Sequence, residues 1–269
     1  MKAIYKRELK SYFCSFTGWL FVAVNLFMMG LYFIVYNMLI GYPTIAYVLQ
    51  SIAFTFIVTI PILTMRVLSE ERKNRTDQLI LTAPVSVGKI VLGKYLALLT
   101  VLALPVAFMG VLPFFLMQGG EVQLGVSYAS LLGFFLYGGL ALAIGLFLSA
   151  LTESVVIAAV LSFGALFLGY IMPGIANLLT TTGTTAVTTA IARILSCFDM
   201  VGRFDTLASG YFELEAVVYY VTASGLALFC TAQVIQKRRY SVSGGGIKLG
   251  AYSVSGIIMA VVLTVALNL

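Results

Sequence analysis

Long stretches without a charged residue constrain this 269-residue chain more than any other feature. They are Ser11–Met65, Tyr95–Gly120, Val122–Thr152, Ser154–Ala192, Ala216–Gln236 and Leu249–Leu269. About 20 apolar residues in a helix cross a bilayer core of about 30 Å. The composition is 61% hydrophobic and 10% charged, with a mean hydropathy of +1.05, which excludes an ordinary soluble domain, a disordered chain and a disulfide-stapled secreted domain. We therefore expect an all-α, polytopic membrane protein.

Seven helical spans are predicted, because a lipid-exposed backbone must satisfy its own hydrogen bonds. The first stretch is too long for one crossing and breaks between residues 37 and 50, around Gly41 and Pro43. The fourth stretch is expected to lose its helical character at Pro173-Gly174. The predicted spans are 17–38, 51–69, 95–117, 126–150, 154–172, 215–236 and 250–268. The first six form one domain at residues 17–240, and the seventh is an addition.

The basic residues are distributed unevenly between the two sides of these spans. By parity, fourteen of the 16 lysines and arginines share a side with the N-terminus, and only Arg193 and Arg203 lie opposite. The positive-inside rule then predicts a multi-pass protein of the cell membrane with a cytoplasmic N-terminus. Topology beside anionic lipid explains the net charge of +6, so we expect no nucleic-acid partner.

Residues 1–16 have helical periodicity of their own. An aromatic and aliphatic set recurs on one face: Tyr5, Leu9, Tyr12, Phe13 and Phe16. The basic residues of the segment lie off that face. We expect an elbow helix along the cytoplasmic interface, with Trp19 near the headgroups. The alternative is that these residues simply begin the first span.

Residues 70–94 form the only long charged segment expected in the cytoplasm. Thr76 can cap a short helix, with Asp77 well placed in its first turn. Pro84 ends that helix, because a residue before proline is disfavoured in the helical region. A second helix is expected to start after Ser86 and to run through Lys89 and Lys94 into the third span. The leucines between Thr76 and Pro84 need a surface that buries them, either the bilayer interface or a soluble partner. The alternative is a solvated loop.

This segment resembles the second-class ABC exporter permeases, specifically the branch associated with gliding motility. The family's pattern begins with a pair of acids and a basic pair, which have counterparts at Glu70-Glu71 and Arg72-Lys73. A threonine and a leucine-rich turn follow, with counterparts at Thr76 and Leu79/Leu81. The pattern ends with Pro-Val-Ser and Gly-Lys, with counterparts at Pro84-Val85-Ser86 and Gly93-Lys94. Arg75 stands where the family usually has glycine. The N-terminus is similar to the family's elbow helix and residues 204–220 to its last outer segment, so the resemblance covers residues 1 to about 240.

The resemblance implies an exporter permease whose loop between the second and third spans docks into a separate ATPase. The residues assigned to this coupling helix are Glu70, Glu71, Arg72, Lys73, Arg75, Thr76, Asp77, Leu79, Leu81, Pro84 and Val85. Two copies of the ATPase would bind ATP and magnesium, because this chain has no GxxxxGK[ST] loop and is not expected to be an enzyme. A second permease copy or a paralogue would complete the pathway, by default with closed twofold symmetry.

Residues 174–214 are expected on the outer side. Apolar residues there recur at helical spacing, and we assign them to an outer gate region: Ile191, Ile194, Leu195 and Phe198. The resemblance favours re-entrant helices that close the outer end of the pathway. We expect no metal site, because the chain has no histidine and only three scattered cysteines.

The C-terminal segment stands apart from the six-span domain. Residues 241–249 are typical of a linker, and residues 250–269 form the extra transmembrane helix. That helix resembles the start of an auxiliary subunit with a large outer domain that accompanies the gliding-type permeases. We expect a fusion to this subunit that is cut at residue 269. The alternative is a complete chain whose seventh helix packs against the bundle.

Other functions are weighed against export. An ATP-driven complex could pass motion to an outer apparatus without moving cargo. An integral membrane enzyme would need paired carboxylates, and the sequence places no two of them on one intramembrane face. An ion channel would need a charged or carbonyl-rich filter motif, which is missing. The absence of ionisable residues from the span centres argues against an ion-driven carrier.

Overall fold

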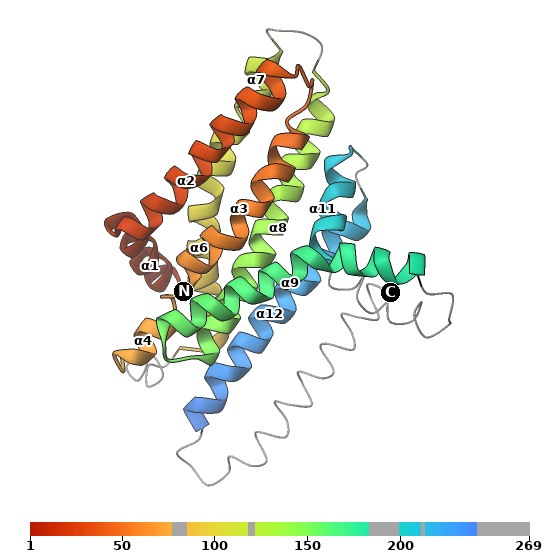
Figure 1. The fold of residues 1–269 in the computed structure, drawn as a ribbon. Helices are drawn as coiled ribbons and strands as arrows, with labels where there is room; N and C mark the ends of the chain where they lie inside the picture. Colours follow the sequence, from red (N-terminus) through yellow and green to blue (C-terminus); the bar gives the residue numbers. More distant parts are fainter. Residues whose placement is uncertain (77–84, 118–121, 183–198, 211–212, 241–269) are drawn as a thin grey trace.

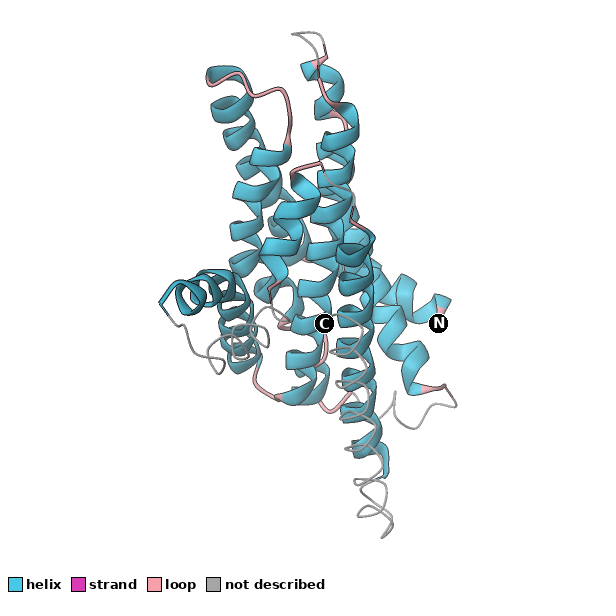
Figure 2. Ribbon diagram, turned by 90° about the vertical axis from the view of Figure 1, so that its right-hand side faces the viewer, coloured by secondary structure: helices cyan, strands magenta, loops and turns pink. Residues whose placement is uncertain are grey.

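The computed structural model describes residues 1–76, 85–117, 122–182, 199–210 and 213–240, and these ranges contain helices and no strand (Figure 1). The helices are α1 (Lys2–Cys14), α2 (Phe16–Phe33), the π-helix η1 (Ile34–Leu39), α3 (Ala46–Thr64), α4 (Ser69–Lys73), α6 (Val87–Met109), α7 (Leu112–Leu116), α8 (Leu124–Leu151), α9 (Val155–Thr182), α11 (Met200–Ala208) and α12 (Leu214–Tyr240). Most of the long helices run along the length of the molecule, and α9 crosses them obliquely (Figures 1 and 2).

Six helical segments in the described ranges are long and apolar enough to cross a membrane. They are Phe16–Leu39, Ala46–Lys73, Val87–Leu116, Leu124–Leu151, Val155–Ile175 and Leu214–Lys237. The all-α, polytopic class is therefore confirmed. The seventh predicted span, 250–268, lies outside the described residues.

One long helix extends further than the sequence predicts, and another begins where the sequence predicts. Helix α9 passes through Pro173 and reaches Thr182, whereas the predicted span ends at 172. Helix α6 begins at Val87, which confirms the helix expected after Ser86, and it continues without a break into the span predicted from residue 95. Proline removes one backbone hydrogen bond, but neighbouring helices and local adjustment let membrane helices tolerate it, and Pro61 and Pro105 likewise lie inside helices. The start of α6 at Val87 places a lysine within the packed helix.

Helix α8 lies at the centre of the bundle and packs against α3, α6, α9, α11 and α12. It lies tightly against α3 at Gly145, where an added Cβ would lie 2.3 Å from Oγ1 of Thr64. At Gly138, an added Cβ would lie 2.8 Å from a methyl group of Leu102 and 2.9 Å from the ring of Phe56. The two glycines therefore allow α8 to approach its neighbours more closely than any other residue would.

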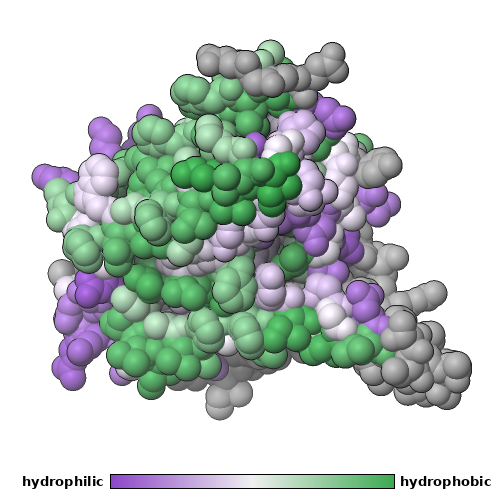
Figure 3. Space-filling view, turned by 45° about the horizontal axis from the view of Figure 1, so that its top comes forward, coloured by the Kyte–Doolittle hydropathy of each residue, from purple (hydrophilic) through white to green (hydrophobic). Residues whose placement is uncertain are grey.

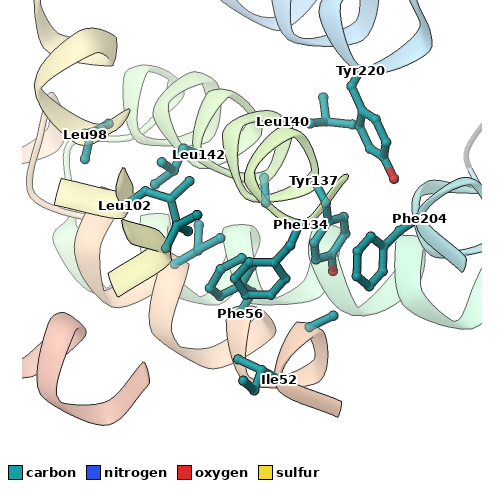
Figure 4. Close-up of a cluster of buried hydrophobic side chains, with 14 of the residues drawn as sticks. Ile52, Phe56, Leu98, Leu102, Phe134, Tyr137, Leu140, Leu142, Phe204 and Tyr220 are labelled. Carbon is teal, nitrogen blue, oxygen red and sulfur yellow. The ribbon is translucent and has the colours of Figure 1, made fainter. Parts of the chain in front are cut away.

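An aromatic cluster joins α3, α8 and α11 (Figure 4). The ring centroid of Phe56 lies 4.5 Å from that of Phe134 and 6.0 Å from that of Tyr137. Phe204 of α11 stacks on Tyr137 with centroids 6.0 Å apart, and its side chain is fully buried. Such ring pairs stabilise a core beyond the area they bury. The short helix α11 is therefore part of the bundle's core.

The outer surface of the bundle is largely apolar. Hydrophobic residues cover much of the face in Figure 3, and strongly hydrophilic residues gather mainly toward its left and right margins. Phe27 of α2 is 67% exposed and Val156 of α9 is 71% exposed. Surface of this kind suits lipid or another membrane-spanning helix.

The elbow between α1 and α2 lies at Ser15. This residue has an extended backbone (φ −103°, ψ 151°), and its hydroxyl accepts a hydrogen bond from the backbone N–H of Thr17. Phe16 therefore begins α2 and is 78% exposed, so its predicted place on the apolar face of the elbow helix is wrong. On α1, Tyr12 is buried, and three further residues are partly buried: Tyr5, Leu9 and Phe13.

Candidate functional site

Four charged side chains meet where α1, α4 and α6 come together, and we call them the Lys94 cluster: Arg7, Glu8, Glu71 and Lys94. Nζ of Lys94 lies 3.0 Å from Oε1 of Glu8 and 2.8 Å from Oε1 of Glu71, and it donates to the carbonyl oxygen of Val67 at 3.1 Å. One guanidinium nitrogen of Arg7 lies 2.7 Å from each of the same two carboxylate oxygens. The cluster thus ties α1 both to the short helix α4 and to the first turns of α6.

The cluster is buried and electrically balanced. The side chain of Lys94 is 0% exposed, that of Glu8 12% and that of Glu71 18%, whereas Arg7 keeps 56% of its side chain exposed. A buried ammonium group is costly unless it is paired and fully hydrogen-bonded. The three N–H donors of Lys94 have three acceptors in reach, and two cations face two carboxylates. Removing one member would therefore leave an uncompensated charge.

The charge state of Glu8 follows from these contacts. Burial alone would raise the pKa of Glu8, but the positive charge of Lys94 and the hydrogen bonds from Arg7 and Lys94 lower it below its ordinary value of 4.5. The carboxylate is therefore ionised at neutral pH. A lowered pKa means that this contribution to stability is complete above the ordinary pKa and is lost as the pH falls through the lowered value.

A second set of contacts ties the segment after α3 to α8 and α9. The hydroxyl of Ser149 accepts hydrogen bonds from the backbone N–H groups of Leu68 and Ser69, each at 3.2 Å. Arg72 forms an ion pair with Glu153 at 2.7 Å and donates to the carbonyl oxygen of Leu151 at 3.0 Å. The start of the predicted coupling segment is thus held by α8 and the turn before α9 as well as by the Lys94 cluster.

The structure separates the predicted coupling residues into three groups. Glu71 and Arg72 make the contacts just described within the chain. Lys73, Arg75 and Thr76 are exposed, and Glu70 is also in α4. Val85 lies just before α6, and four predicted residues lie outside the described ranges: Asp77, Leu79, Leu81 and Pro84. The predicted capping of a helix by Thr76 therefore stays a prediction, although its hydroxyl donates to the carbonyl oxygen of Glu71 at 3.1 Å.

Arg75 has a left-handed backbone, with φ at 56°. This is the position where the resembling family usually has glycine. A left-handed backbone costs a residue with a side chain about 1–2 kcal/mol, and glycine avoids this cost. Glycine also loses more backbone entropy on folding, which offsets about 0.5–1 kcal/mol of the gain. We therefore expect Arg75→Gly to raise the free energy of unfolding by about 0.5–1 kcal/mol, measured by denaturant unfolding in detergent micelles. Arg75→Ala is the control for the lost charge, and an equal gain from it would contradict the explanation.

Sequence analysis missed the role of two members of this cluster. Glu8 is the one acid of α1, and it lies on the same helix face as Tyr5 and Tyr12, three residues after the first and four before the second. Lys94 lies between Val91 and Leu98 on an apolar face in the same way. A single charge on an apolar helix face predicts a buried partner of opposite sign. The lone charges at Glu8 and Lys94 carry this signal, but Lys94 was used only as one of the basic residues that determine the topology.

Part of the predicted outer region is described. The residues assigned to the outer gate lie outside the described ranges: Ile191, Ile194, Leu195 and Phe198. Asp199 caps α11 by accepting a hydrogen bond from the backbone N–H of Gly202 at 2.6 Å. Gln50 of α3 donates to Asp205 of α11 at 3.1 Å, and burial raises the pKa of both aspartates. Across the described ranges, no three potential metal ligands come together.

A comparison with known families identifies the chain. The profile of a family described as ABC-2 family transporter protein matches residues 41–266. No curated protein matches the chain. The match includes every described helix from α3 onward and extends to residue 266, within the predicted seventh span. The chain therefore belongs to the ABC-2 family, as the multi-pass membrane component of a transporter of that family.

Proposed function

We propose that this chain is the permease subunit of an ABC exporter and that it docks a separate ATPase through residues 70–85. The observation that carries the proposal is the Lys94 cluster. Glu71 lies at the start of the segment and Lys94 follows its end, and one ion network joins the two. A loop that merely connects two spans does not require an ion network between its two ends. A loop that transmits a partner's movement to the spans must have its two ends held rigidly to the helix bundle.

The arrangement of basic residues supports a cytoplasmic position for this end of the bundle. Exposed basic residues from four elements share it: Lys2, Lys6 and Lys10 of α1, Lys73 of α4, Lys89 of α6 and Lys237 of α12 (Figure 1). Basic residues concentrate on the cytoplasmic side of membrane proteins. We therefore place α4 and the segment after it on the side where an ATPase has access to ATP, with the N-terminus cytoplasmic.

The complete transporter would contain two permease subunits and two ATPase subunits. The exposed apolar faces of α2 and α9 offer room for a second membrane-spanning subunit within the bilayer. At the other end, α11 and residues 174–214 would contribute to closing the pathway. Three further points rest on the sequence resemblance and stay predictions: the gliding-motility branch, the origin of residues 250–269 in an auxiliary subunit, and the alternative role of passing motion to an outer apparatus.

Co-purification tests the docking. We expect an ABC ATPase to copurify with the full chain in mild detergent. The double substitution Leu79→Asp and Leu81→Asp should lower the amount of ATPase recovered at least tenfold. A matched control carries Leu39→Asp and Ile40→Asp at the opposite end, where the two side chains are 76% and 57% exposed. This control should retain the ATPase. Equal recovery with both variants would refute docking through residues 70–85.

A further inference from the structure

The outward face of α1 carries a stripe of basic residues. Lys2, Lys6 and Lys10 follow one another at intervals of four residues, so they lie along one stripe of the helix, and all three are exposed. The helix has a single acid, Glu8, which points inward and is paired with Lys94. Among the described residues, the three lysines form no ion pair. The inward turn of Glu8 therefore leaves the positive charge of this stripe unopposed.

Arg7 adds to the same charge. Both of its ion pairs use one guanidinium nitrogen, and 56% of its side chain remains exposed. The guanidinium group has five N–H donors in total. Arg7 thus lies at the border between the Lys94 cluster and the basic stripe.

Aromatic side chains lie where this helix ends. Trp19 is 54% exposed and its indole N–H donates to the carbonyl oxygen of Phe13 at 2.8 Å, while the two rings meet edge to face. Phe16 beside them is 78% exposed and begins the first membrane-spanning segment. Tryptophan in such a position marks the boundary between headgroups and acyl chains. The basic stripe is therefore suited to the headgroup layer of a bilayer, and the aromatic end of the helix is suited to the start of the acyl chains.

We propose that the outward face of α1, formed by Lys2, Lys6 and Lys10 with Arg7 at its border, binds the phosphate of an anionic phospholipid headgroup. A lipid fits better than a free anion, because the same helix end offers apolar rings to the acyl region. Lysine is a mobile point charge that suits a phosphate at a membrane surface. The test of this site is independent of the ATPase-docking proposal, because Lys2, Lys6 and Lys10 form no ion pair with the described residues of the segment 70–85. Only Arg7 links the two, through its ion pair with Glu71.

Native mass spectrometry of the purified full chain with phosphatidylglycerol or phosphatidylcholine tests this site. The variant Lys2→Gln, Lys6→Gln, Lys10→Gln is compared with a matched control, Lys73→Gln, Lys89→Gln, Lys237→Gln. The control removes the same charge from three exposed lysines at the same end. We expect the α1 variant to weaken phosphatidylglycerol binding about tenfold and the control less than twofold, with phosphatidylcholine unaffected. The lysine-to-arginine version of the α1 variant keeps the positive charge and should therefore bind phosphatidylglycerol as the original chain does.

Three results would overturn the proposal. Equal losses in the two glutamine variants would mean that net charge alone attracts the lipid. An unchanged affinity in the α1 variant would place the lipid elsewhere. Displacement of phosphatidylglycerol by millimolar inorganic phosphate would mean that the face binds a free anion instead of a lipid. None of these results depends on whether an ATPase binds residues 70–85.

Discussion

Replacing Lys94 by methionine is expected to lower the free energy of unfolding by about 3–5 kcal/mol, the usual cost of breaking a buried ion pair from one side. The substitution keeps the length of the side chain and removes its charge. Glu8 and Glu71 would then share only Arg7, which is half exposed, and the carbonyl oxygen of Val67 would lose its donor. Denaturant unfolding in detergent micelles measures the change.

Two further variants decide whether the lost pairing is the cause. Lys89→Met, at an exposed position five residues earlier on α6, should change stability by less than about 0.5 kcal/mol. Adding Glu8→Gln to Lys94→Met should recover part of the loss, because it removes one of the two carboxylates left unbalanced. A Lys94→Met protein as stable as the original would contradict the structure of the Lys94 cluster. The same would hold if Lys89→Met cost as much.

Gly145→Ala is expected to lower the free energy of unfolding by about 1–3 kcal/mol, the range for overpacking a filled core. The new Cβ would lie 2.3 Å from Oγ1 of Thr64 and 2.9 Å from both its Cβ and its Cγ2. Thr64 cannot easily turn away, because its side chain is buried and its hydroxyl donates to the carbonyl oxygen of Ile60 at 3.0 Å. Helices α3 and α8 would have to move apart.

The matched control is Gly164→Ala on α9, where an added Cβ would meet nothing within 4 Å. That substitution should be neutral or stabilising by up to about 1 kcal/mol through helix propensity. Combining Gly145→Ala with Thr64→Ala should restore part of the loss, because two of the three close atoms disappear. Equal effects of Gly145→Ala and Gly164→Ala in the same unfolding assay would show that close packing at Gly145 is not the cause.

The fold class was predictable from sequence because each span is a long stretch without charges. Lipid leaves a helix as almost the only solution for such a stretch, so few residues were needed to decide it. The boundaries were harder. Helix α9 continues past Pro173, because a proline inside a membrane helix costs one hydrogen bond and does not by itself end the helix. The elbow at Ser15 was placed one residue too late, because Phe16 has the same periodicity as the apolar face of α1.

The candidate site was predictable in part. Local motifs identified residues 70–85 as the segment of interest, but they could not show that Glu71 faces inward. Its partners, Arg7 and Lys94, come from two other helices, and only packing brings them together. Lys94 was counted as a residue of the cytoplasmic loop on charge alone. Whether a charged residue is buried in a paired cluster depends on the three-dimensional arrangement of the helices. The positive-inside rule counts basic residues on each side and contains no information on their burial.

The most direct test of ATPase docking is site-specific photo-crosslinking in native membranes. A photoreactive residue replaces Leu79 or Leu81 in the segment, or Phe114 of α7 at the opposite end of the bundle, which is 57% exposed (Figure 1). We predict a crosslinked product that contains an ABC ATPase from positions 79 and 81 and none from position 114. A product from position 114, or none from positions 79 and 81 in membranes that contain the ATPase, would contradict the account.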